Sequence, residues 1–316
     1  MNTEIVKGLI IKGSRNIITV RAETKEGIKE LECRIKGKVL QTNKENYNPF
    51  APGDWVTIEL SETNDNTALI LSLEKRQNFF SRFNQKESAS QILAANIDLV
   101  LCITTPVSPP FRPRFIDRIL LQADIAGIEP IIVCNKIDLK YDDIDINERL
   151  EDFNKTGFKV LFVSSKTGEG LNELRNNIEG KTGMLIGQSG VGKSSLINAL
   201  LPGLNIKEGK LNEKYDRGVH TTTMSYLIDV SEKTKIIDTP GVRVFIPDGI
   251  KANEVIFHMK EFAPLAGKCS FGLSCSHKTE PGCKIMEAVT AGIIHEDRYE
   301  SLIRIAEDIE GSINEY

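Results

Sequence analysis

Eight consecutive residues near the middle of the chain have the types and spacing of a phosphate-binding loop. In the pattern G-x-x-x-x-G-K-[ST], backbone N–H groups surround nucleotide phosphates, the lysine reaches the β- and γ-phosphates, and the final hydroxyl ligates Mg²⁺. The apolar run 184–186 predicts a buried strand before the loop, and the amphipathic run 195–201 predicts a helix after it. A glycine-rich turn without a ligand is the alternative. The predicted phosphate site comprises Gly187, Gln188, Ser189, Gly190, Val191, Gly192, Lys193, Ser194 and the adjoining Ser195.

A second segment predicts which base is bound. Asn135, Lys136 and Asp138 form an N-K-x-D sequence after the apolar run 130–134. They therefore lie at the carboxyl end of a predicted strand, where ligands bind in open α/β sheets. The Asp138 carboxylate can accept from N1–H and the 2-amino group of guanine, whereas adenine has neither donor, and Asn135 can bond the other edge. On its own, such a tetrapeptide is often a surface turn.

A third segment, Ser164, Ser165 and Lys166, follows the predicted strand 160–163. It resembles the loop that closes over guanine in GTPases. Three such loops at the ends of strands favour one shared pocket for GTP or GDP over three coincidences.

Two segments after the phosphate loop have the features of nucleotide-sensing switches. Asp238 and Gly241 occupy the ends of a D-x-x-G sequence after the predicted strand 235–237. In this switch the aspartate holds Mg²⁺ through water, and the glycine N–H meets the γ-phosphate. The run 217–223 ends in three threonines, of which Thr222 or Thr223 is predicted to ligate Mg²⁺. A plain threonine-rich loop is the alternative for this run.

Catalysis of hydrolysis is assigned to Lys193 and His220. Many GTPases have a glutamine directly after the D-x-x-G glycine to orient water, but this chain has the apolar Val242 there. We therefore expect slow intrinsic turnover, with the missing group supplied from elsewhere. His220, a titratable side chain beside the switch threonines, is the internal candidate. A histidine that only packs within the loop is the alternative.

The order of these motifs differs from that of an ordinary GTPase. The guanine loops precede the phosphate loop and both switches, whereas usually the phosphate loop comes first. The predicted helix 171–178 runs through a short turn into the strand of the phosphate loop. This order indicates a circular permutation, which leads the chain from the second switch directly into a C-terminal region.

The C-terminal region contains four potential metal ligands within fifteen residues. They are Cys269, Cys275, His277 and Cys283. Three thiolates and one imidazole suit tetrahedral Zn²⁺, and four protein ligands leave no open position, so the predicted site is structural. Buried free cysteines are the alternative.

Together these motifs resemble the RsgA (YjeQ/YloQ) family of circularly permuted GTPases, which are bacterial assembly factors of the small ribosomal subunit. The resemblance rests on the runs 94–98, 187–198, 218–223 and 238–241 and on the terminal cluster. It implies GTP hydrolysis with Mg²⁺ on the small ribosomal subunit, contact with its rRNA, and release after hydrolysis. One departure is that five residues, and not the family's four, separate Cys269 from Cys275.

The N-terminal region reads as short strands separated by turns, at 17–20, 31–35, 55–60 and 68–73. This spacing suits a small barrel of the OB type, which binds oligonucleotides, although a barrel that binds none is an alternative. Residues 1–44 carry ten Lys and Arg against five Asp and Glu, so a basic face including Lys36 and Lys38 could follow a phosphate backbone. The family resemblance favours RNA. Residues 76–96 read as a linker.

The whole sequence predicts three domains. These are an all-β OB-fold barrel over 1–75, a circularly permuted P-loop GTPase α/β domain over 76–245, and a mainly helical zinc-binding domain over 246–316. The net charge of −4 argues against a globally basic nucleic-acid binder. No apolar leader and no 18-residue apolar run occur, so a cytoplasmic protein without membrane contact is expected, and we expect a monomer.

Three other functions are compatible with parts of the sequence. The presence of both a barrel and the cysteine cluster argues against a permuted GTPase of large-subunit assembly. A nucleotide-gated RNA-binding module would show no useful catalysis. A metabolic P-loop kinase would need a pocket for an acceptor substrate, which the guanine loops give no reason to invoke.

Overall fold

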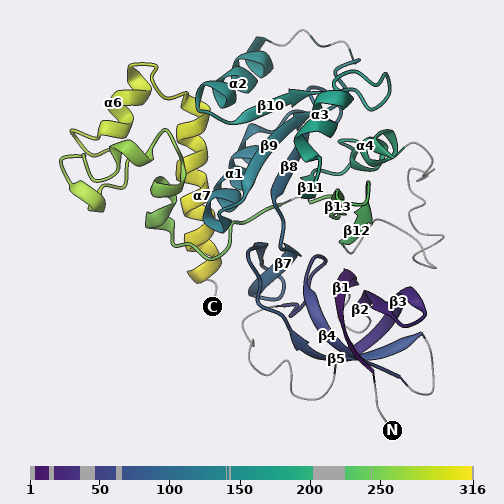
Figure 1. Ribbon diagram of the computed structural model, residues 1–316. Coiled ribbons are helices and arrows are strands. Elements are labelled where there is room, and N and C mark those ends of the chain that lie inside the picture. Colours follow the sequence, from purple (N-terminus) through teal and green to yellow (C-terminus); the bar gives the residue numbers. More distant parts are fainter. Residues whose placement is uncertain are drawn as a thin grey trace.

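Five short strands at the N-terminal end close into a barrel (Figure 1). The computed structural model describes residues 4–13, 18–35, 47–61, 66–139, 141, 144–201, 225–242 and 244–314. The barrel strands are β1 (Ile5–Gly13), β2 (Ile18–Thr24), β3 (Gly27–Ile35), β4 (Trp55–Leu60) and β5 (Thr67–Leu73). Pairing runs β1–β2–β3–β5–β4 and returns to β1, with only β3 and β5 parallel. The predicted OB-type barrel is confirmed.

Strand β1 was not predicted from the sequence, and the burial of this strand explains why. Residues 8–11 are buried without alternation. Ile10 belongs to the core of the barrel, whereas Leu9 and Ile11 on the opposite face belong to the core of the next domain. A strand buried on both faces has no period-two pattern of polar residues to reveal it.

The central domain has a six-stranded sheet with helices on both faces. Its strands are β8 (Leu99–Thr104), β9 (Glu129–Cys134), β10 (Lys159–Phe162), β11 (Thr182–Gly187), β12 (Tyr226–Asp229) and β13 (Lys235–Asp238), in the order β10-β9-β8-β11-β13-β12. All are parallel except β12. Helices α1 (Pro113–Ala126) and α2 (Ile144–Lys155) cover one face, and α3 (Leu171–Ile178) and α4 (Lys193–Leu200) cover the other. The phosphate-loop strand β11 lies between β8 and β13, so the predicted permuted α/β architecture is confirmed.

The segment predicted as a linker instead contains a β-hairpin, β6 (Phe79–Asn84) with β7 (Ala89–Ala95). The hairpin contacts the barrel through the Ala95 N–H, which donates to the Pro52 carbonyl at 3.0 Å. It contacts the chain after the second switch through the Phe83 N–H, which donates to the Ile246 carbonyl at 3.0 Å. Its fully buried Phe80 ring lies 5.8 Å from that of Phe245. The hairpin therefore packs between domains, in contact with the barrel and with the chain after the second switch.

The barrel and the central sheet meet at a strand junction. Residue Lys12 of β1 pairs with Tyr226 of β12 in antiparallel register, so the two sheets are continuous. Beside this junction, Arg21 of the barrel pairs with Asp229 of β12 and with Glu30.

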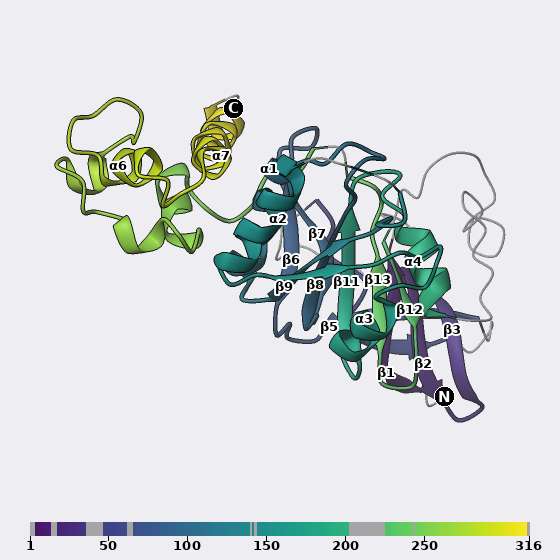
Figure 2. The ribbon, with the colours of Figure 1, turned by 90° about the horizontal axis from the view of Figure 1, so that it is seen from above.

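The C-terminal region is a group of helices that lies beside α1, on the side away from the barrel (Figure 2). It comprises the 3-10 helices η2 (Ala252–His258), η3 (Ala263–Leu265) and η4 (Gly272–Ser274), followed by α6 (Lys284–Thr290) and α7 (Glu296–Asn314). On α7, Leu302, Ile305 and Ile309 are buried, whereas Ile303 and Ala306 are only half-buried. The three domain boundaries stay a prediction.

A buried ion-pair network fastens α7 to α1. The Asp117 carboxylate of α1 accepts hydrogen bonds from Arg298 and Ser301 of α7 and lies 3.4 Å from Arg149 of α2. Arg298 also donates to Glu261 at 2.8 Å. These side chains of Asp117, Arg149 and Arg298 are at most 4% exposed.

Candidate functional site

The phosphate loop lies between the carboxyl end of β11 and the first turn of α4. Gly190 and Gly192 have φ angles of 85° and 91°, in the left-handed region that glycine adopts without strain. A Cβ at Gly192 would approach Nδ2 of Asn135 to 2.5 Å. The Lys193 ammonium is buried and donates to the carbonyls of Gly187 and Gln188, at 3.0 and 3.2 Å. Burial lowers the pKa of Lys193, and the charge of Asp238 opposes that shift.

Asn135 joins the phosphate loop to the third predicted loop. Its side chain is fully buried, Nδ2 donates to the Val191 carbonyl at 3.0 Å, and Oδ1 accepts from the Ser165 N–H at 3.1 Å. The next residue, Lys136, donates from Nζ to the carbonyls of Ser108 and Gly190, at 2.7 Å each. Both residues therefore hold the phosphate loop in place through hydrogen bonds to its carbonyl groups, a role that was not predicted from the sequence.

The predicted guanine-reading carboxylate lies against the third loop. Oδ1 of Asp138 accepts from the Ser164 hydroxyl at 2.7 Å, and Oδ2 lies 3.9 Å from the Lys166 ammonium. The Asp138 side chain is 13% exposed and that of Lys166 is 81% exposed. The Ser164 hydroxyl thus fixes one oxygen of Asp138, and the exposed Lys166 ammonium lies beside the other.

The Asp238 carboxylate is buried next to the phosphate loop with one oxygen unpaired. Oδ2 accepts from the Tyr226 hydroxyl at 3.3 Å, whereas Oδ1 has no hydrogen-bond partner within the described part of the chain. Burial raises the pKa of Asp238 to about 6, against the opposing charge of Lys193. An unpaired buried carboxylate oxygen is costly unless a donor or cation arrives, so the residues fit Mg²⁺ held directly or through water. Ser194, the other predicted Mg²⁺ residue, lies half-buried in the first turn of α4.

Gly241 brings the second switch into contact with the phosphate loop. A Cβ there would come within 2.9 Å of the Ser189 Cα. The next residue, Val242, is buried among the apolar residues beneath the sheet, and its N–H donates to the Gly187 carbonyl at 3.3 Å. A valine in that place has no polar atom in its side chain to orient water. His220, Thr222 and Thr223 lie outside the described residues.

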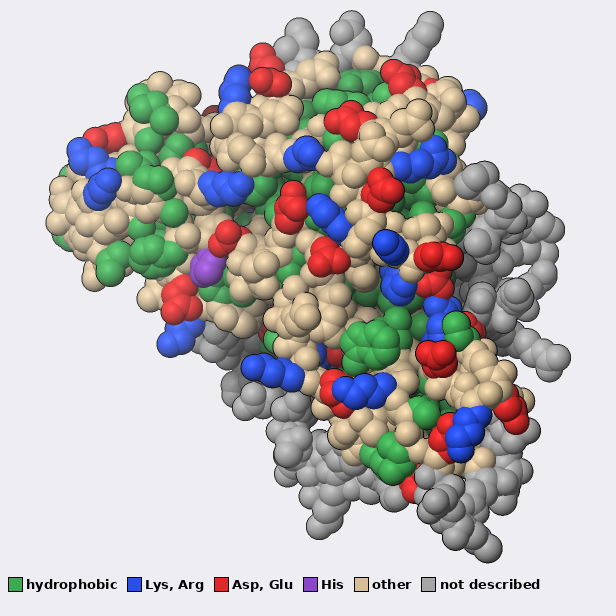
Figure 3. Space-filling model, viewed as in Figure 1, with side chains coloured by type: hydrophobic (Ala, Val, Ile, Leu, Met, Phe, Trp, Pro, Cys, Tyr) green, Lys and Arg blue, Asp and Glu red, His purple; other side chains and the backbone are tan. Residues whose placement is uncertain are grey.

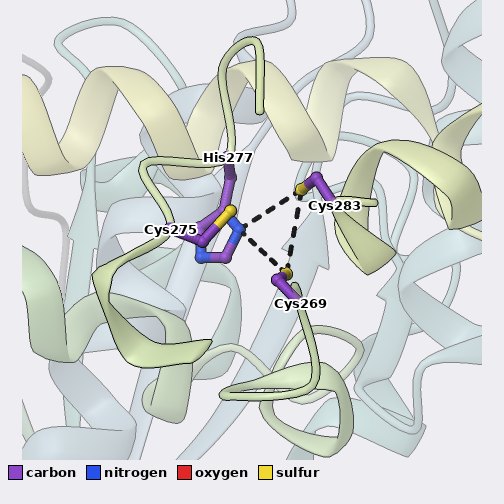
Figure 4. Close-up of side chains that lie close together, drawn as sticks. All are labelled: Cys269, Cys275, His277 and Cys283. Atoms are coloured by element: carbon purple, nitrogen blue, oxygen red, sulfur yellow. Dashed lines mark hydrogen bonds between the residues drawn. The ribbon is translucent and has the colours of Figure 1, made fainter. Parts of the chain in front are cut away.

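The four C-terminal ligands converge as the sequence predicted (Figure 4). Their potential ligand atoms all lie within 4.8 Å of one another. Nδ1 of His277 lies 3.6 Å from Sγ of Cys269 and 3.4 Å from Sγ of Cys283, and the two sulfur atoms are 3.9 Å apart. The longer spacing before Cys275 therefore does not displace Cys269 from the cluster.

The surroundings of this cluster also suit a metal ion. The Lys284 N–H donates to the Cys269 sulfur at 3.3 Å, and the Tyr299 hydroxyl donates to the His277 carbonyl at 2.7 Å, which holds the ligand loop. Burial raises the pKa of Cys275 to about 12 and lowers that of His277. A divalent cation reverses the first shift, because it stabilises the thiolate that binds it. The donor set of three sulfurs and one imidazole fits Zn²⁺.

Helices long and apolar enough to span a bilayer do not occur in the described ranges of the chain.

Comparison with known proteins shows which family has this arrangement of motifs. A family model described as RsgA GTPase matches residues 73–246. The "Small ribosomal subunit biogenesis GTPase RsgA 2" of Bacteroides thetaiotaomicron is 36% identical over 312 residues, covering 96% of this chain and 97% of that protein. The "Small ribosomal subunit biogenesis GTPase RsgA" of Flavobacterium psychrophilum is 38% identical over 282 residues, covering 88% and 86%.

Two solved structures share the fold. YjeQ from Thermotoga maritima superposes with a TM-score of 0.71 at 30% identity, covering 98% of this chain and 99% of that one. YloQ, a circularly permuted GTPase, superposes with a TM-score of 0.66 at 24% identity, covering 98% and 96%. With a family model that matches more than half of its length and relatives aligned along most of it, the chain belongs to the RsgA GTPase family.

Proposed function

We propose that the chain hydrolyses GTP in the cytoplasm during biogenesis of the small ribosomal subunit, in contact with its rRNA. The observation that carries the proposal is the convergence of four segments from distant parts of the sequence. Asn135 contacts both the phosphate loop and Ser165, and Gly241 contacts Ser189. The names of the relatives supply the ribosomal partner, because they describe small-subunit biogenesis GTPases.

The chemistry follows from the positions of the side chains. The Lys193 ammonium and the N–H groups of the loop would stabilise negative charge on the β- and γ-phosphate oxygens, and Asp138 would select guanine. Ser194, Asp238 and a switch threonine would hold Mg²⁺, which neutralises phosphate charge when bound. To receive phosphates, Lys193 exchanges its two carbonyl contacts for phosphate oxygens.

The buried Val242 leaves the attacking water without a side-chain partner at that position. We therefore propose slow intrinsic hydrolysis that the ribosomal particle accelerates, with His220 as the internal candidate for orienting the water. Single-turnover hydrolysis by His220→Ala on the activating particle tests this role, with GTP affinity measured separately. Unchanged hydrolysis would remove His220 from the mechanism.

Contact with RNA would be local. Acidic and basic side chains are interspersed over the face shown in Figure 3. On the barrel, the exposed residues of β3 include Glu30 and Glu32 beside Arg34, so this strand is not basic. Lys36 and Lys38, the predicted phosphate contacts, lie outside the described residues.

The deciding experiment is GTP turnover with purified small subunits, large subunits and neither, together with a measurement of bound zinc and of mass in solution. We expect stimulation by small subunits alone, one zinc per chain and a monomer. Stimulation only by large subunits would favour assembly of that particle. Turnover at background with every particle would favour a nucleotide-gated RNA-binding module.

A further inference from the structure

One side chain outside every predicted motif touches the magnesium-binding switch. Tyr226 of β12 and Asp238 of β13 are paired directly across the two antiparallel strands. The Tyr226 hydroxyl donates to Oδ2 of Asp238 at 3.3 Å. Oδ1 of the same carboxylate, in a residue that is 2% exposed, has no hydrogen-bond partner among the described residues. The contact therefore divides the carboxylate into one oxygen fixed by protein and one left available.

Fixing one oxygen restricts rotation of the whole carboxylate. A residue that binds a cation directly or through water depends on such outer contacts for its orientation, and their loss typically reduces metal affinity about 10- to 100-fold. We propose that Tyr226 is a positioning residue for the Mg²⁺ site: it holds Asp238 so that Oδ1 faces the bound nucleotide and its cation. The inference rests on the proposed GTP site.

The backbone of Tyr226 gives this role a further consequence. Tyr226 is also the β12 residue that pairs with Lys12 of the barrel strand β1. Its neighbour Leu227 packs in the same apolar core as Leu9 and Ile11 of β1. Tyr226 therefore takes part both in the strand junction with the barrel and in the orientation of the magnesium carboxylate. A displaced barrel would change the Mg²⁺ site through Tyr226.

The test uses the full-length protein and the change Tyr226→Phe, which removes only the hydroxyl. Binding of a fluorescent, non-hydrolysable GTP analogue is titrated with Mg²⁺ and, separately, measured in excess EDTA. We expect the Mg²⁺ midpoint to rise about 10-fold while affinity in EDTA stays within about twofold, because the hydroxyl acts on the cation site alone. Tyr141→Phe is the matched control: it removes one hydroxyl bond, to Asn147 of α2 at 3.2 Å, and leaves both values unchanged.

Two results would overturn the proposal. One is an unchanged Mg²⁺ midpoint in Tyr226→Phe, and the other is an equal loss of affinity with and without Mg²⁺, which indicates a general structural role. A double-mutant cycle separates the role from poor folding: in an Asp238→Asn background the tyrosine change is expected to have no further effect on the midpoint. If the wild-type protein itself binds no guanine nucleotide with Mg²⁺, the proposed function fails first.

Discussion

The contacts of Asp138 predict how a single substitution changes the choice of base. In Asp138→Asn, the side-chain oxygen can keep the hydrogen bond from the Ser164 hydroxyl, which now lies 2.7 Å from Oδ1. The new amide group then occupies the place of Oδ2, which lies 3.9 Å from the Lys166 ammonium. We therefore expect the loop to keep its structure while its recognition chemistry changes.

The size of the effect follows from the two hydrogen bonds that the carboxylate would accept from guanine. Each bond to a charged acceptor contributes about 1.5–3 kcal/mol. The introduced NH2 group cannot accept one of the two bonds and the remaining oxygen is neutral, so GTP binding is expected to weaken about 10²- to 10³-fold. Xanthine carries a carbonyl oxygen in place of the 2-amino group, and the amide introduced by the substitution can donate to it. The same change is therefore expected to strengthen binding of XTP.

The assay is calorimetric titration of wild-type protein and variant with GTP, XTP and ATP. Asp145→Asn serves as the control, because it makes the same change at an exposed carboxylate in the first turn of α2. Retention of wild-type GTP affinity by Asp138→Asn in a folded protein would refute the assignment of guanine recognition to this residue.

Three other predictions concern stability and metal content. Cys269→Ser is expected to abolish stoichiometric zinc binding and to increase proteolysis of the C-terminal region. Cys33→Ser in the barrel core is the control and is expected to leave the zinc content unchanged. A zinc content of Cys269→Ser equal to that of the wild type would contradict this prediction. Asp117→Ala removes the buried carboxylate that Arg298 and Arg149 share, leaving Arg298 with Glu261 and Arg149 with Asp297 at 3.8 Å, and is expected to cost about 3 kcal/mol, measured by hydrogen exchange in α7. Glu300→Ala, which breaks two exposed pairs, with Arg114 and with Arg304, costs less than about 1 kcal/mol, and equal effects of the two changes would be incompatible with this explanation. Because the folded pKa of Asp238 is raised from 3.8 to about 6, its stabilising contribution is complete below pH 4 and disappears as the pH rises through 6. The nucleotide-free protein is thus expected to lose about 3 kcal/mol over that window relative to Asp238→Asn, in denaturant unfolding at several pH values; parallel curves would disprove it.

The motifs could be predicted because their chemistry is local. The phosphate loop, the D-x-x-G switch and the cysteine–histidine cluster each fall within a short stretch of sequence. Their order along the chain is sufficient to indicate the permutation, which the strand order confirms. Strand β4 and helix α3 were also placed correctly, because each has a clear amphipathic period.

What sequence reasoning missed depends on contacts between distant segments. The hairpin β6–β7 reads as a linker because its buried partners, including Phe245, lie far away along the chain. Asn135 looks like a base-reading residue, yet its amide bonds are to Val191 and Ser165. Tyr226 carries no motif: only the register of β12 with β13 brings its hydroxyl to Asp238. Its one sequence signal is its position on a strand just after the switch threonines.

The strand junction between barrel and central sheet has a consequence for solubility. Strand β12 ends the central sheet, and β1 of the barrel covers its outer edge, with Leu9 and Ile11 against Leu227. An uncovered strand edge with an apolar flank is a template for pairing with other chains. A fragment lacking the barrel would present this edge to its own copies, so it is expected to aggregate even if its nucleotide pocket folds intact.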